Sequence, residues 1–153
     1  METVTKEKNQ NATVDLLDRM YKNVKMGSDS IINLMPKVKD EALRTEMTSE
    51  LSKLEGYSSK IGKMLFNEGK TPKEEGIVSK LSSKMGISMN TMIDSTSSHI
   101  AEMMMEGYTM GITDMTKDIR EYENTTASEA SLKLAREIVS FHEQSFSAMK
   151  KFL

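Results

Sequence analysis

Apolar residues that step by three and four along the chain restrict this protein to helical folds. Such spacing places side chains on one face of an α-helix. Only two prolines interrupt the 153 residues, and no segment alternates apolar and polar residues as a half-buried strand would. The sequence therefore predicts an all-α fold. The four apolar stripes are Val14, Leu17, Tyr21, Val24, Ser28, Ile31 and Met35; Leu43, Met47, Leu51, Leu54, Ser58, Ile61 and Leu65; Ile100, Met103, Met104, Gly107, Met110, Met115 and Ile119; and Leu132, Ala135, Val139, His142, Phe146, Met149 and Leu153.

Helix-start and helix-stop signals lie between these stripes. Pro36 disfavours a helical residue before it and ends the first segment. Asp40 is predicted to cap the second helix, and Gly69 to end it. The stretches Thr71-Pro72-Lys73-Glu74 and Thr126-Ala127-Ser128-Glu129 both have the capping-box pattern, which predicts a helix beginning at each.

The lengths of the connections predict a topology. Short turns near residues 36–40 and 124–126 imply two antiparallel hairpins. The chain between them is long enough for a crossover helix over about 72–93, and the polar run 94–98 predicts a break after it. Two hairpins joined by one long crossover form one of the recognised four-helix-bundle topologies.

Composition limits the class of protein. A hydrophobic content of 37% and a charged content of 29% fit one domain over residues 1–153, with residues 1–12 expected to form a flexible N-terminal tail. No apolar run approaches the ~18 residues of a membrane span, and the amino terminus lacks a secretory signal, so we expect a cytoplasmic protein. The net charge of −2 and the lack of a basic stripe argue against nucleic-acid binding. The absence of cysteine excludes disulfides and thiolate chemistry.

With this topology the chain resembles the ferritin-like superfamily, particularly its small uncharacterised bacterial four-helix-bundle members. The resemblance implies a di-metal carboxylate centre of iron or manganese, with a Glu on each of two helices and Glu-x-x-His on each of the others. The expected motif is degenerate in this sequence. No glutamate lies between Glu7 and Glu41, Lys53 follows Glu50 where histidine is needed, and Val139 precedes His142 where glutamate is needed.

Glu50, Glu106 and His142 remain as candidate metal ligands. Glu106 and His142 each lie about eighteen residues from the turn near residue 124, so an antiparallel hairpin brings them to one level. One interpretation is a buried His142–Glu106 pair that fixes helix register, and the other is a metal site that Glu50 joins. His99 begins a helix among serines and is interpreted as a surface residue.

Fifteen methionines are the compositional anomaly. Thioethers suit Cu(I), but Met103, Met104 and Met105 are consecutive and diverge by ~100° each, which favours a core or an oligomer interface over a copper site. Gly107 and Gly111 predict close approach of a neighbouring helix, with Tyr108 directed away from it. We therefore predict a homodimer with this helix or the crossover helix at the interface.

Two functions follow from these observations. The first is a non-catalytic ferritin-like bundle that acts through self-association or protein partners, with no cofactor. The second is an iron- or manganese-binding protein, or less favourably a copper-binding one, with an oxidase-like or storage role. The incomplete ligand set favours the first, and no Ser-His-carboxylate set supports an enzyme with a nucleophile.

Overall fold

Four long helices make up most of the described part of this computed structural model. It describes residues 2–72 and 94–153, with side chains in the first helix from Ala12 onward. No strand occurs in these residues, which confirms the all-α prediction. The helices are α1 (Glu2–Leu34), α2 (Glu41–Asn67), α4 (Ser97–Tyr122) and α5 (Glu129–Met149), with short 3-10 turns at Met35–Lys37 and Lys150–Phe152.

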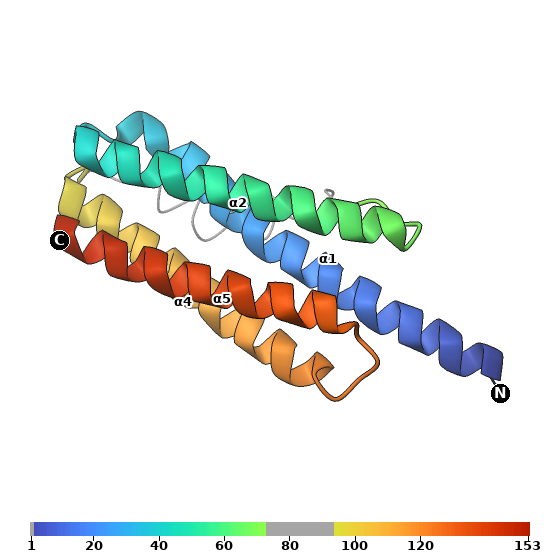
Figure 1. Cartoon of the computed structure of the whole chain (residues 1–153). Helices are drawn as coiled ribbons and strands as arrows, with labels where there is room; N and C mark the ends of the chain where they lie inside the picture. Colours follow the sequence, from blue (N-terminus) through green and yellow to red (C-terminus); the bar gives the residue numbers. More distant parts are fainter. Residues whose placement is uncertain (1, 73–93) are drawn as a thin grey trace.

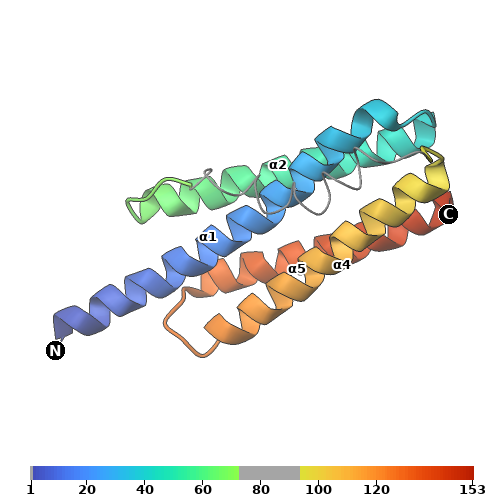
Figure 2. The same cartoon turned by 180° about the vertical axis from the view of Figure 1, so that it is seen from behind.

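The helices pack as two antiparallel hairpins, α1 with α2 and α4 with α5 (Figures 1 and 2). The hairpins meet mainly through α1 and α4, which also run in opposite directions (Figure 1). This arrangement is the predicted four-helix bundle. The predicted crossover helix, apart from its first position at residue 72, and the second half of the first capping box, residues 73 and 74, lie outside the described residues.

Local sequence signals account for the helix ends. Pro36 lies in the 3-10 turn that follows α1, and the Asp40 carboxylate accepts the Leu43 N–H at 2.9 Å as the cap of α2. At the other end of α2, Gly69 has a φ of 74°, and the Lys70 N–H donates to the Leu65 carbonyl at 2.9 Å. A glycine in the left-handed region after the last turn is the usual helix stop, so these three predictions are confirmed.

Two other boundaries differ from the prediction. Helix α5 is capped by Ser128, whose hydroxyl accepts the Ser131 N–H at 3.2 Å, and not by Thr126. Thr125 takes part in the preceding turn instead, where its hydroxyl accepts the Ala127 N–H, so the capping box was placed two residues early. Residues 2–12, expected to form a tail, continue α1 as helix, since they contain neither proline nor glycine to stop it.

One continuous core fills the bundle. The fully buried side chains include Leu17, Leu54, Met115 and Ile138, one from each helix. The described part contains no helix long and apolar enough to cross a membrane.

Candidate functional site

Four polar side chains, one from each helix, lie close together in the bundle, three of them buried and Asn23 half-buried. They are Asn23 on α1, Glu50 on α2, Tyr108 on α4 and His142 on α5. Glu50 and His142 are each only 2% exposed, and Tyr108 is 3% exposed. Buried polar groups need partners, so the bonds within this group decide what it can do. We call these four residues the polar layer.

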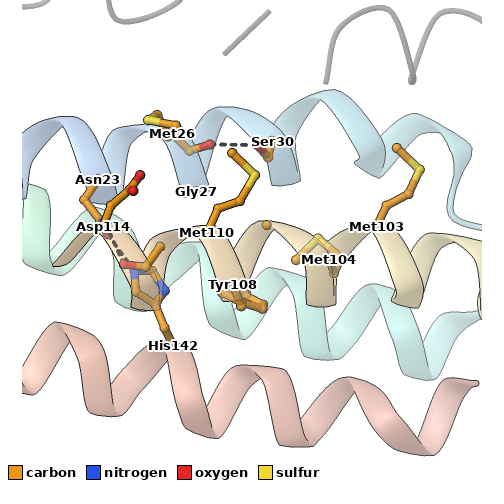
Figure 3. A pocket seen from close by; sticks show the side chains of 12 residues that line it. Asn23, Met26, Gly27, Ser30, Met103, Met104, Tyr108, Met110, Asp114 and His142 are labelled. Carbon is orange, nitrogen blue, oxygen red and sulfur yellow. Dashed lines mark hydrogen bonds between the residues drawn. The ribbon is translucent and has the colours of Figure 1, made fainter. Parts of the chain in front are cut away.

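His142 is held by α1 and α4 together. Its Nε2 lies 2.6 Å from Asn23 Oδ1, while Asn23 Nδ2 donates to the Gly111 carbonyl oxygen at 3.0 Å (Figure 3). Because the Asn23 amide donates to that carbonyl, its oxygen faces the imidazole and accepts from Nε2–H. This assigns the tautomer of His142 and leaves Nδ1 as an unprotonated ring nitrogen.

Gly111 makes room for this arrangement. A Cβ atom added at Gly111 would lie 3.0 Å from His142 Nε2 and 3.1 Å from Cδ2. The predicted close approach at Gly111 is therefore confirmed, although the neighbour is a side chain and not a helix backbone. Gly56 meets nothing within 4 Å among the described residues.

Glu50 and Tyr108 form the second half of the polar layer. The Tyr108 hydroxyl donates a short hydrogen bond to Glu50 Oε1. Burial raises the pKa of Glu50 to about 8, and the neighbouring Glu46 acts in the same direction. Burial also raises the pKa of Tyr108, with the Glu50 charge adding to the effect. Glu50 is therefore mostly protonated and neutral at pH 7.

Aromatic rings surround the imidazole. The rings of Tyr108 and Phe141 have centroids 5.6 Å from that of His142. Burial lowers the pKa of His142 to about 4, so the side chain is neutral at pH 7. His142 Nδ1 and Glu50 Oε2 are both buried without a hydrogen-bond partner among the described residues.

The predicted pairing of Glu106 with His142 is wrong. Glu106 is exposed, and the partner of His142 is Asn23. A His142→Leu substitution would therefore strand the Asn23 carbonyl oxygen and not a Glu106 carboxylate. His142 itself faces the interior as predicted, and His99 lies at the partly exposed start of α4 beside Glu102.

A di-metal centre does not fit the residues that are present. Such a centre needs several carboxylates to balance two metal charges. In the polar layer α2 supplies Glu50, whereas α1 supplies an amide and α4 supplies a phenol. Within the described residues, no group of three or more His, Asp or Glu side chains could hold a metal ion.

Sequence reasoning missed Asn23 and Tyr108. Tyr108 was expected to point away from the packed face, yet it is buried against Glu50. The sequence signal for Asn23 is a second row of residues on α1. These residues are spaced alternately by four and three positions and lie beside the predicted stripe. This row consists of Leu16, Met20, Asn23, Gly27, Ser30 and Leu34.

A cavity of about 40 Å³ lies next to the polar layer, between α1 and α4 (Figure 3). Asn23 and His142 form part of its wall. Most of the remaining large side chains in the wall are methionines, namely Met26, Met103, Met104 and Met110. A cavity of this size can hold a few water molecules or one ion, but no organic ligand of ordinary size.

Comparison with known proteins identifies the fold. No protein-family model matches the chain, and no curated protein matches its sequence. Among solved structures, a point mutant of Mycobacterium smegmatis Dps1 superposes with a TM-score of 0.76. The match covers 94% of this chain and 96% of that one, at 16% sequence identity. The protein therefore has the ferritin-like four-helix-bundle fold.

Proposed function

We propose that this protein is a non-catalytic ferritin-like bundle that acts through self-association or contacts with protein partners. The observation that carries the proposal is the composition of the polar layer. Its one carboxylate, Glu50, is neutral at pH 7 and bonded to Tyr108, while Asn23 and not a carboxylate engages His142. These contacts link α2 to α4, and α1 to α4 and α5, so the layer has a structural use in fixing helix register.

Metal analysis tests the first part of the proposal. Untagged protein purified without chelator should contain much less than one iron or manganese ion per chain, because the polar layer offers too little negative charge for such a metal. The measurement is elemental analysis by mass spectrometry. Stoichiometric metal that is lost in Glu50→Gln and His142→Ala, and kept in the exposed Glu106→Gln control, would contradict the proposal.

That contrary outcome corresponds to a second candidate function, a mononuclear metal protein with an oxidase-like or storage role. Glu50 Oε2 and His142 Nδ1 support it, because both are buried ligand-type atoms without a hydrogen-bond partner in the described part of the chain. The ferritin-like fold also implies metal chemistry by resemblance. Glu106 has no place in this version, since its side chain is exposed.

The surface of α4 supports self-association. Met110 is 41% exposed and is the one large apolar side chain of α4 that is exposed among the described residues. It lies in a shallow groove with Met105, Glu106, Thr109 and Phe146, which runs between α4 and α5. Methionine and aromatic residues are enriched at protein interfaces, and Glu106 is the one charged residue among those that line this groove. We propose that this groove forms the contact between two copies of the chain.

The Thr109→Arg variant tests the proposed dimer. Thr109 is exposed, and its hydroxyl donates to the Met105 carbonyl of the same helix at 2.9 Å, so arginine should leave the helix intact and block the contact. Sedimentation equilibrium should give a dimer for the wild type and a monomer for the variant. Thr45→Arg on α2 is the matched control, because Thr45 is also exposed and makes the same bond to Glu41. A monomeric wild type at all concentrations would remove the dimer proposal.

A further inference from the structure

The methionines around the cavity come from two helices. Met26 belongs to α1, and Met103, Met104 and Met110 belong to α4. Met103 and Met110 share one face of α4, and Met26 approaches that face from α1. The packing of α1 on α4 brings all four side chains to the wall of one cavity (Figure 3). Methionine has three rotatable bonds, so its sulfur can move within such a space without shifting the backbone.

The thioether groups in the wall of this cavity favour soft metal ions over hard ones. Thioether sulfur is a soft donor that suits Cu(I), whereas Mg²⁺ and Mn²⁺ prefer carboxylate and carbonyl oxygen. The chain has no cysteine to compete for a soft cation. His142 also lines the cavity, but its Nε2–H is already donated to Asn23. Asp114 contributes carboxylate oxygen, which is a hard donor, so the soft donors at the cavity are the methionine sulfurs.

An ion can reach the cavity. Met103 and Met104 are only 6% and 4% exposed, whereas Met110 is 41% exposed, so the wall extends from the core to the surface. Asp114 also lines the cavity and is exposed, and its negative charge attracts cations to this side of α4. The volume of about 40 Å³ admits one ion and excludes larger ligands.

We propose that this cavity binds one Cu(I) ion through the thioether sulfurs of its methionines. The inference does not depend on the proposed function, because it uses side chains other than the Glu50–Tyr108 pair and involves no catalytic step. It differs from a ferritin-like di-metal centre in both place and donor type. The site lies between α1 and α4, and sulfur replaces carboxylate oxygen.

A competition titration measures the affinity. Full-length protein is titrated anaerobically with Cu(I) in the presence of the chromophoric chelator bicinchoninate, which reports the copper that the protein withdraws. We expect one equivalent per chain, and at least a tenfold weaker affinity in Met104→Leu/Met110→Leu. Leucine conserves the volume closely enough to retain the fold, which circular dichroism checks. Met105→Leu is the matched control, since Met105 is adjacent on α4 but does not line the cavity.

A second measurement locates the ion. In protein labelled with ¹³C at the methionine methyl groups, Ag(I) serves as a redox-inert soft cation, and the resonances of Met26, Met103, Met104 and Met110 should shift. A tenfold excess of Mn²⁺ should not reverse the shifts. Three results would overturn the proposal: no withdrawal of Cu(I), equal loss of affinity in Met105→Leu, or shifts confined to methionines outside the cavity.

Discussion

The free energy of unfolding of the Gly111→Ala variant is expected to be about 1–3 kcal/mol lower than that of the wild type. Alanine normally stabilises a helix interior by up to ~1 kcal/mol relative to glycine. Here the new Cβ atom would lie 3.0, 3.1 and 3.3 Å from three atoms of the His142 ring. The ring cannot move aside freely, because Asn23 holds Nε2 at 2.6 Å and aromatic rings pack around it. The measurement is urea denaturation at pH 7.

A matched substitution separates this steric effect from helix propensity. Gly56 lies inside α2 with nothing within 4 Å of its added Cβ among the described residues, so Gly56→Ala should stabilise by about 0.5–1 kcal/mol. In a His142→Ala background, Gly111→Ala should no longer destabilise, because the ring that it meets is gone. A Gly111→Ala protein as stable as the wild type would show that the His142 site is not rigid.

The helix ends and the all-α fold class could be predicted from the sequence because they depend on local chemistry. A proline, an N-cap carboxylate and a glycine in the left-handed region each act on their own neighbours, so Pro36, Asp40 and Gly69 were sufficient evidence. The two short connections then gave the hairpins. The cap of α5 was misplaced because Thr126 and Ser128 are both capping residues, and the tertiary contact of the Ser128 N–H with Thr13 Oγ1, at 3.0 Å, has no trace in the local pattern.

The candidate site depended on helix rotation, which the periodicity alone did not determine. On α4 four members of the predicted stripe are buried as expected, namely Ile100, Met103, Met104 and Met115. The stripe was wrong at Met110, which is 41% exposed, and it missed Tyr108, which is buried. Helix α1 buries two rows because it contacts both α2 and α4, and a single stripe cannot reveal that.

The predicted height of His142 along the bundle, relative to the residues of α4, was nearly right. The turn extends from Tyr122 to Glu129, so its midpoint places residue 142 opposite about residue 109. Tyr108 and Gly111 lie at this level and contact the imidazole. Glu106 lies at nearly the same height along the hairpin as His142, but its side chain projects from the exposed face of α4. Counting residues from a turn therefore predicts height along a hairpin, while the direction of a side chain requires knowledge of the neighbouring helices.

The stability of the protein is expected to fall by about 2 kcal/mol between pH 6.5 and 8, and Glu50→Gln should abolish this fall. Burial raises the pKa of Glu50 from the ordinary 4.5 to about 8 in the folded protein. At pH 6.5 the unfolded state has already released this proton, whereas the folded state still holds it and releases it as the pH rises towards 8, so rising pH favours unfolding. Above pH 8 both states are ionised at this position, and the loss is complete.

His142 gives the opposite dependence at lower pH. Its pKa falls from the ordinary 6.5 to about 4 on folding, so the unfolded state binds the additional proton between these values, and stability rises with pH there. From pH 4.5 to 6.5 the two residues oppose each other, and the wild type should show a plateau. In Glu50→Gln the rise due to His142 should appear alone, at about 2–3 kcal/mol over pH 4–6.5.

Urea denaturation at half-unit pH intervals tests both expectations in one series. The amide introduced by Glu50→Gln retains an oxygen that can accept the Tyr108 hydroxyl, so this substitution removes the charge while keeping the contact. Glu55→Gln on the exposed face of the same helix is the control and should follow the wild-type curve. If the wild type shows no fall above pH 6.5, Glu50 ionises in the folded state as easily as in the unfolded state. The polar layer would then be accessible to water, and its buried structural role would be lost.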